Sequence, residues 1–235
     1  MTEVTLPQGD VHLRGTATGV GPTVLLLHAG GERRSVWTPV AAALNKHDLR
    51  TVAFDLRGHG DSTGRASTLQ LVADDVTAMI HSEPSPLVVV GASLGGLAAI
   101  AALADPHTAA AVAGLILVDV VPNHDPARVR TWLTKQSLRD QRTDLVEDIF
   151  SRAHELSAAT TTLSLPILLV RGGPTSPLSD AEVDQFRAIC PRATVSQIPT
   201  AGHLVANDAP DDLARIVAVQ SSTWLATDTA TCRHP

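Results

Sequence analysis

The stretch Leu87-Val88-Val89-Val90-Gly91-Ala92-Ser93-Leu94-Gly95-Gly96 decides the fold class of this 235-residue chain. A short apolar run bounded by glycine is typical of a strand that is buried on both faces of a parallel sheet. Residues 94–104 are rich in Leu and Ala, which favours a helix after the turn. The turn itself has the pattern G-x-S-x-G, which places a serine hydroxyl on a sharp strand-to-helix corner. We therefore interpret Ser93 as a candidate nucleophile.

Similar strand and helix patterns alternate along the chain on both sides of this turn. The predicted strands cover 23–28, 51–55, 87–91, 113–119, 166–171 and 194–198, and an antiparallel edge hairpin covers 2–17. The predicted helices cover 36–44, 68–80, 94–104, 181–189 and 211–225. Repeated strand–helix units predict an α/β fold with a doubly wound, mostly parallel sheet.

One stretch, between Val121 and Leu165, departs from this alternation. It is predicted to form two polar amphipathic helices, over about 126–136 and 143–158, and it holds six basic and six acidic residues. About forty residues are too few for a convincing independent core. We therefore expect a short helical cap over 122–163, inserted into a single core formed by residues 1–121 and 164–235.

Composition and charge exclude several other classes of protein. Apolar residues make up 44% of the chain, which is enough for a sizeable core, and the net charge of −6 argues against a nucleic-acid-binding face. The two cysteines, Cys190 and Cys232, have no zinc-site or disulfide-scaffold spacing. The N-terminus lacks the pattern of a signal peptide, and no apolar run is long enough to span a membrane. We expect a cytoplasmic protein with neither nucleic acid nor membrane as a partner.

Three further segments complete a pattern that the serine turn begins. They are 25–31 (LLLHAGG), 54–62 (FDLRGHGDS) and 201–203 (AGH). With the turn at Ser93, and in this order, they resemble the α/β-hydrolase fold superfamily, of the single-domain type with a short cap that includes esterases, lactonases and perhydrolases. The resemblance covers nearly the whole chain. It implies a small-molecule substrate, and the sequence has no metal, nucleotide or flavin signature, so we expect no cofactor.

The resemblance implies roles for residues in these motifs. Ser93 would attack the substrate, and His203 would act as the general base that takes the hydroxyl proton. The chain contains no tyrosine, so backbone amides must stabilise the oxyanion. The expected donors are Gly30 and Leu94, with Gly31 as the alternative to Gly30.

The acid that would orient His203 has more than one candidate. Family members usually carry it after the strand that corresponds to 167–170, but the residues aligned with that position here are Thr175 and Ser176. Asp119 ends the strand expected beside the serine strand, and some family members place the acid there. Asp180 lies a few residues past the usual position and fits a helix N-terminus. We favour Asp119, with Asp180 as the alternative acid and a dyad without an acid as the third option.

Two residues are candidates for contact with the substrate. Arg34 follows the 25–31 loop, where it could bind an acidic group, and Trp132 lies on the predicted cap, where it could form a pocket wall. Further candidate wall residues on the cap are Leu133, Leu138, Ile149 and Phe150. His28 and the 54–62 turn are expected to order loops rather than to react.

Three hypotheses for function follow. The favoured one is a serine hydrolase that cleaves a small-molecule carboxylic ester, lactone or thioester through an acyl-enzyme. The second keeps the fold but uses the histidine as a base for C–C bond cleavage, a lyase reaction, perhydrolysis or cofactor-free oxygenation. The third is a non-catalytic ligand-binding protein, motivated by the missing acid. Epoxide hydrolase and dehalogenase activities are disfavoured because the resembling enzymes carry Asp where this chain has Ser93.

Overall fold

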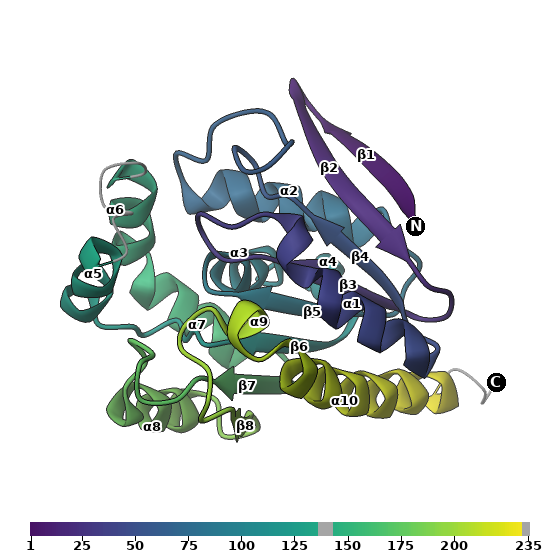
Figure 1. Cartoon of the computed structure of the whole chain (residues 1–235). Coiled ribbons are helices and arrows are strands. Elements are labelled where there is room, and N and C mark those ends of the chain that lie inside the picture. The colour runs from purple at the N-terminus through teal and green to yellow at the C-terminus, as the bar shows by residue number, and fades with distance from the viewer. Residues whose placement is uncertain (136–142, 232–235) are drawn as a thin grey trace.

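The structure is a computed structural model, and it describes residues 1–135 and 143–231 (Figure 1). Its centre is an eight-stranded sheet in the order β1-β2-β4-β3-β5-β6-β7-β8. The strands are β1 (Thr2–Gln8), β2 (Val11–Thr18), β3 (Thr23–Leu27), β4 (Arg50–Phe54), β5 (Leu87–Ala92), β6 (Val112–Val118), β7 (Ile167–Arg171) and β8 (Thr194–Gln197). The β1–β2 and β2–β4 pairs are antiparallel, and all other pairs are parallel. The predicted mostly parallel sheet with an antiparallel edge hairpin is confirmed.

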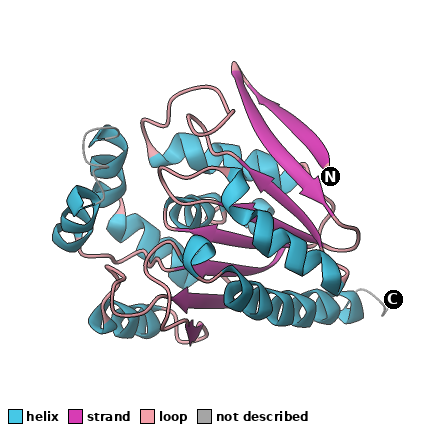
Figure 2. Cartoon of the chain, in the orientation of Figure 1, coloured by secondary structure: helices cyan, strands magenta, loops and turns pink. Residues whose placement is uncertain are grey.

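Helices flank both faces of the sheet (Figure 2). They are η1 (Arg34–Trp37), α1 (Thr38–Leu44), η2 (Asn45–His47), α2 (Leu69–His81), α3 (Leu94–Ala102), α4 (Pro106–Ala110), α5 (Pro126–Lys135), α6 (Thr143–Ser151), α7 (Ala153–Thr162), α8 (Asp180–Ile189), α9 (Val205–Asp208) and α10 (Pro210–Thr231). The stretch 143–158, predicted as one helix, forms parts of two helices, because the helical conformation is interrupted at Arg152 between α6 and α7. Within the described ranges, no helix is both long and apolar enough to cross a lipid bilayer.

The central strands are buried on both faces. Leu25 and Val89 pack into one core cluster on the side of α2 and α3, while Leu26 and Val90 pack into a second cluster on the side of α1 and α10. All four side chains have no exposed surface. This burial explains why the strands contain continuous apolar runs rather than alternating polar and apolar residues.

The segment predicted as a cap lies between β6 and β7 and contains α5, α6 and α7. In Figure 1, α5 and α6 stand at the left end of the molecule, toward which β7 points. α7 instead packs against α3 and α8, and its Leu156 and Thr160 are buried. The boundaries 122 and 163 stay a prediction. Of the three helices, α5 and α6 line the cavity in front of Ser93, and α7 does not.

The order of the strands opens a crevice at their carboxyl ends. β3 and β5 are neighbours in the sheet. The chain continues from β3 to β4, on the side away from β5, and from β5 to β6, on the side away from β3. The loops after β3 and β5 therefore leave the sheet in opposite directions. Ligands of open α/β sheets bind at such a switch point, and this is where the glycine-rich loop 29–31 and Ser93 meet.

Candidate active site

Ser93 lies at the corner between β5 and α3 with a positive φ of 45° and ψ −112°, a backbone conformation that residues other than glycine rarely adopt. Glycines make this corner possible. A methyl group on Gly91 would lie 2.6 Å from Cα of Gly96, and one on Gly95 would lie 2.6 Å from the carbonyl oxygen of Leu27. Both distances are shorter than atoms can approach, so any larger residue would push the helix off the sheet. The G-x-S-x-G pattern therefore serves close packing, and it presents Ser93 at the carboxyl end of β5.

Three side chains from distant segments form one hydrogen-bonded chain at this corner. Nε2 of His203 lies 3.1 Å from Oγ of Ser93, and Nδ1 of His203 lies 2.8 Å from Oδ2 of Asp119. An ionised carboxylate only accepts hydrogen bonds, so Nδ1 carries the ring proton and Nε2 is left to accept the serine hydroxyl proton. Asp119 directly follows β6, while His203 lies in the loop between β8 and α9. The arrangement is that of a nucleophile, its base and an orienting acid.

The carboxylate of Asp119 is fully buried and accepts hydrogen bonds from three groups. Besides His203, the backbone amide of Gly172 donates to Oδ1 at 2.6 Å, and the hydroxyl of Ser176 donates to Oδ2 at 2.5 Å. Three donors offset the free-energy cost of burying a negative charge. Ser176 is not among the site residues predicted from the sequence. Its only signal is that it aligns with the usual place of the acid.

Asp180, the alternative acid, lies outside this group. It is the first residue of α8, its side chain is 88% exposed, and its carboxylate pairs with Arg171 at 2.5 Å. Ser179 and Glu182 form the capping box of the helix. Asp180 thus lies in the first turn of a helix, where an acidic residue is favourable, and the structure brings Asp119 rather than Asp180 to His203.

The loop after β3 lies against the start of α3. A methyl group added to Gly30 would be in van der Waals contact with Leu94, 3.8 Å from its Cβ atom. Leu94 opens α3, so its amide has no hydrogen-bond partner within the helix. Gly30, Gly31 and Leu94 all line the cavity in front of Ser93. The two predicted oxyanion donors are therefore neighbours beside the serine.

Glu32 anchors this loop through hydrogen bonds, although it is not among the site residues predicted from the sequence. Its carboxylate accepts a hydrogen bond from the backbone amide of Ala29 at 3.1 Å and one from the side chain of Asn207 at 2.7 Å. Asn207 lies on α9, four positions after His203, so Glu32 links the loop to the segment that carries the histidine. Burial raises the pKa of Glu32 above its ordinary value, although the Ala29 amide and His203 act in the opposite direction.

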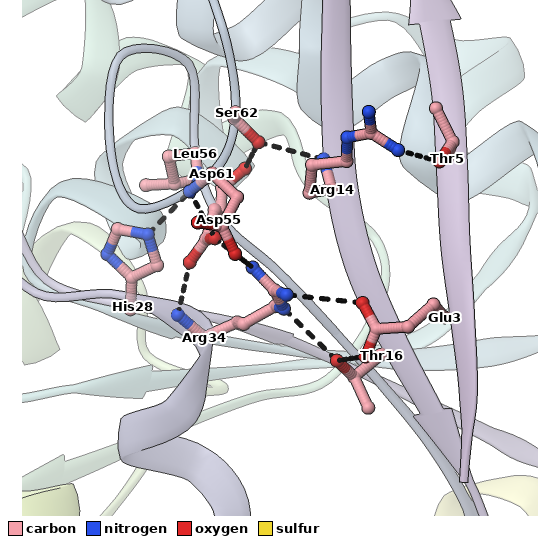
Figure 3. Close-up of polar contacts among 10 residues, drawn as sticks. All are labelled: Glu3, Thr5, Arg14, Thr16, His28, Arg34, Asp55, Leu56, Asp61 and Ser62. Atoms are coloured by element: carbon pink, nitrogen blue, oxygen red, sulfur yellow. Dashed lines mark hydrogen bonds and ion pairs between the residues drawn. The ribbon is translucent and has the colours of Figure 1, made fainter.

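Arg34 lies in a polar network (Figure 3) and does not line the cavity that holds Ser93, contrary to the expectation that it contacts substrate. Its guanidinium pairs with Asp55, with Asp61 at 2.8 Å and with Glu3 at 3.2 Å. Its backbone amide also donates to Asp55 at 2.6 Å, and the Asp55 side chain is fully buried. The charge of Arg34 is balanced by carboxylates of the protein itself.

The same network orders the 54–62 turn (Figure 3). The hydroxyl of Ser62 donates to the carbonyl oxygen of Asp55 at 2.7 Å, and the backbone amide of Leu56 donates to Nε2 of His28 at 3.0 Å. His28 is fully buried, and its Nδ1 lies 2.7 Å from the carbonyl oxygen of the next residue. His28 and the turn thus fix the shape of the loops, and none of their residues lines the cavity that holds Ser93.

A predominantly apolar cavity opens in front of Ser93. The space in front of the serine amounts to about 1100 Å³ when the open solvent at its mouth is included. The core contributes the glycine loop and α3, and the cap helices α5 and α6 form the opposite wall. Apolar lining residues include Leu97, Val121, Leu133, Leu145, Ile149 and Phe150. Leu138, also predicted as a wall residue, lies outside the described residues.

Trp132 of α5 covers the histidine. The centroid of its ring lies 4.5 Å from that of His203, and the two planes meet at 67°, an edge-to-face contact. Trp132 also lines the cavity, where the sequence placed it as a candidate wall. Its contact with His203 connects the cap directly to the reacting groups.

The chain is similar to known proteins over most of its length. The model of the alpha/beta hydrolase family matches residues 24–216. Protein phosphatase methylesterase 1 of Mus musculus is 38% identical over 114 residues, which cover 43% of this chain and 28% of that protein. A pimeloyl-[acyl-carrier protein] methyl ester esterase of Aromatoleum aromaticum is 25% identical over 248 residues, covering 83% of this chain and 96% of that protein. The match thus spans under a third of the methylesterase but nearly all of the bacterial esterase.

Solved structures of similar shape include two bacterial esterases. The esterase from Exiguobacterium antarcticum has a TM-score of 0.75 at 14% identity and covers 94% of this chain and 100% of that chain. A thermophilic esterase from Thermogutta terrifontis has a TM-score of 0.71 at 22% identity and covers 97% and 99%. At this level of identity the likeness establishes the fold alone.

Proposed function

The chain belongs to the α/β-hydrolase family, and from that premise we propose that it is a serine hydrolase of small-molecule carboxylic esters, lactones or thioesters. The observation that carries the proposal is the hydrogen-bonded chain from Ser93 through His203 to the buried Asp119, with distances of 3.1 and 2.8 Å. Ser93, at one end of these hydrogen bonds, lines a predominantly apolar cavity. Two relatives named as methyl ester hydrolases support the choice of an ester bond.

Acylation begins at Ser93. As Oγ attacks the carbonyl carbon of the substrate, Nε2 of His203 takes the hydroxyl proton, since it is already within hydrogen-bond distance. The imidazolium that forms is stabilised by Asp119, whose carboxylate holds Nδ1. Because Asp119 also accepts hydrogen bonds from Gly172 and Ser176, its position is fixed before the substrate arrives.

The negative charge that develops on the carbonyl oxygen needs donors in a fixed position. In our proposal these are the backbone amides of Gly30 and Leu94, two residues that are neighbours and that both line the cavity. The amide of Leu94 also lies at the N-terminal end of α3, where the helix dipole is positive. Loss of one such donor typically lowers turnover by about 10²–10³-fold.

The second half of the reaction releases the acid. His203 returns the proton to the leaving alcohol or thiol, and the tetrahedral intermediate collapses to an ester between Ser93 and the acyl group. Water then enters, gives a proton to Nε2 of His203 and attacks the acyl carbon. Collapse of this second intermediate frees the carboxylic acid and restores the Ser93 hydroxyl.

Labelling with a fluorophosphonate probe tests whether Ser93 is an activated nucleophile. We expect one label per chain on Ser93, no label on Ser93→Ala, and slow labelling of His203→Ala. In parallel, hydrolysis of p-nitrophenyl butyrate should fall by at least about 10³-fold in Ser93→Ala. A folded wild-type protein that takes no label would overturn the proposal. A Ser93→Ala protein that keeps its activity would instead favour histidine-base chemistry without an acyl-enzyme.

A further inference from the structure

The short helix α9 contacts both of the segments on which the proposed reaction depends. It begins two positions after His203, and it packs against η1, which follows the loop after β3. Its Val205 and Ala206 side chains are buried in the core cluster on the side of α1 and α10. The next two residues, Asn207 and Asp208, carry polar side chains on a helix that is already anchored in the core.

The side chain of Asp208 holds the loop that carries the histidine. Its Oδ2 atom accepts a hydrogen bond from the backbone amide of Gly202 at 2.7 Å, directly before His203. A methyl group added to Gly202 would lie 3.2 Å from the same oxygen and 3.1 Å from the hydroxyl of Thr175. The backbone beside the histidine therefore fits tightly against α9.

The side chain of Asn207 holds the other loop through Glu32. Nδ2 of Asn207 donates to Oε1 of Glu32 at 2.7 Å, and Oε2 of Glu32 accepts a hydrogen bond from the backbone amide of Ala29 at 3.1 Å. The backbone amide of Glu32 in turn donates to the carbonyl oxygen of Ala29 at 3.1 Å. Glu32 thus closes the turn 29–32 and ties it to α9.

This turn contains Gly30, whose backbone amide is the proposed oxyanion donor. A glycine has no side chain that could fix the direction of its own amide, so the orientation depends on the hydrogen bonds of its neighbours. A donor stabilises the transition state only if it is in place before the charge develops, and displacement by about 1 Å can cost 10²-fold in rate. The turn therefore needs an anchor that keeps a fixed position relative to the triad.

We propose that Asn207 and Glu32 are positioning residues of the hydrolase, which hold the Gly30 amide in register with His203 through their mutual hydrogen bond. The inference rests on the proposed function, because it takes Gly30 to be the oxyanion donor. Asn207 and Glu32 both lie outside the lining of the cavity that holds Ser93. Their loss should therefore lower kcat and leave KM nearly unchanged.

Asn207→Ala tests the proposal, because it removes the donor but leaves Glu32 bonded to Ala29. We expect kcat for p-nitrophenyl butyrate to fall by about tenfold, less than the 10²–10³-fold typical of a lost donor, since the amide is displaced rather than removed. Propyl trifluoromethyl ketone, whose adduct with Ser93 carries an oxyanion, should lose affinity by the same factor. An unchanged kcat in folded Asn207→Ala protein would overturn the inference.

Asn45→Ala is the matched control for a merely structural loss. Nδ2 of Asn45 also bridges two segments, donating to the carbonyl oxygen of Leu49 at 2.9 Å. Leu49 directly precedes β4, at the edge of the sheet opposite Ser93. This variant should lower the melting temperature while keeping the wild-type kcat and the wild-type affinity for the ketone.

A double variant assigns the effect to the hydrogen bond between the two side chains. If Asn207 acts through Glu32, then Glu32→Ala with Asn207→Ala should have the kcat of Glu32→Ala alone. Losses that multiply in the double variant would contradict the proposal. If Glu32→Ala does not fold, Asn207→Asp replaces it: two carboxylates then face each other, and kcat should fall at least as far as in Asn207→Ala.

Hydrogen–deuterium exchange separates this inference from the proposed function, because it needs no reaction. The amides of residues 29–31 should exchange faster in Asn207→Ala than in wild type, and at the wild-type rate in Asn45→Ala. This difference, in a wild-type protein that hydrolyses no ester and takes no fluorophosphonate label, would sink the proposed hydrolysis and keep α9 as the anchor of the turn. Ester hydrolysis with unchanged kcat and exchange in Asn207→Ala would have the opposite meaning.

Discussion

The hydroxyl of Ser176 donates a hydrogen bond to the buried carboxylate of Asp119, 2.5 Å from Oδ2, the oxygen that also faces His203. By its resemblance to the family, Ser176 occupies the place after β7 where the acid usually lies. In the proposed triad the acid, Asp119, lies instead at the end of the neighbouring strand β6, and the loop after β7 supports it with a hydrogen bond. In this chain the loop after β7 contributes a hydrogen-bond donor to the carboxylate of Asp119 rather than a carboxylate of its own.

Asp119→Asn should lower kcat for p-nitrophenyl butyrate by about 10³–10⁴-fold. The asparagine amide keeps the shape of the side chain, but it removes the charge that stabilises the histidine cation, and its NH₂ group can favour the wrong tautomer. Steady-state kinetics on protein of unchanged thermal stability checks this. Asp180→Asn is the matched control and should stay within about twofold of wild type, since Asp180 pairs with Arg171. A nearly unchanged Asp119→Asn rate would mean that a dyad without an acid carries the reaction.

Ser176→Ala should reduce kcat by about tenfold while leaving KM nearly unchanged, because it removes one donor to a charged acceptor and does not touch the substrate. A purely structural role would instead lower the melting temperature and spare the turnover of the folded fraction. Both quantities are measured on the same preparation.

A double substitution tests the relocation of the acid directly. Asp119→Asn with Ser176→Asp returns a carboxylate to the loop after β7, within reach of the same atoms. We expect this double variant to be at least about tenfold more active than Asp119→Asn. Asp119→Asn with Ser176→Ala should be no more active than Asp119→Asn. Equal activities of the two double variants would show that the loop cannot place an acid against His203.

Local patterns in the sequence predicted the sheet and part of the site. Ser93 and His203 lie in short motifs whose meaning does not depend on distant residues, and Asp119 follows from the adjacency of two buried strands. Arg34 was misplaced because its neighbours in sequence do not reveal that its side chain turns toward Asp55, 21 positions away. Ser176 and Glu32 were missed for a related reason, since their partners lie 57 and 175 positions away, respectively. Unlike Ser93 and His203, neither Ser176 nor Glu32 lies in a motif that predicts its partner, so these pairings become visible only in the fold.

Arg34→Gln tests the corrected role of this residue. It removes the cation paired with the fully buried Asp55, so we expect the free energy of unfolding to fall by about 3 kcal/mol. KM for p-nitrophenyl butyrate should not change, because Arg34 lies outside the cavity. Urea denaturation and steady-state kinetics measure the two effects. Arg33→Gln, at the exposed neighbour, should alter stability by no more than about 0.5 kcal/mol. A raised KM with unchanged stability would return Arg34 to the substrate site.

Glu32 should make the stability of the protein depend on pH in a definite direction. Burial raises its pKa in the folded protein above the ordinary value of 4.5. Between that value and the raised pKa, the folded protein binds more protons at this site than the unfolded chain, so this group's contribution to stability falls as pH rises through the window. Above the raised pKa Glu32 is ionised in both states, so its contribution to stability no longer changes with pH. Below the ordinary value of 4.5 it is protonated in both states, so no stability is lost there.

Glu32→Gln removes this titration while keeping an oxygen that can accept from Ala29 and an amide group near Asn207. The variant should therefore gain stability relative to wild type as the pH is raised from about 4 to about 7. Urea denaturation of both proteins at half-unit pH steps gives the difference curve, and Glu155→Gln, at an exposed carboxylate on α7, controls for the removal of one charge. A difference between Glu32→Gln and wild type that stays flat across this range, or slopes the other way, would contradict the link between burial of Glu32 and its titration.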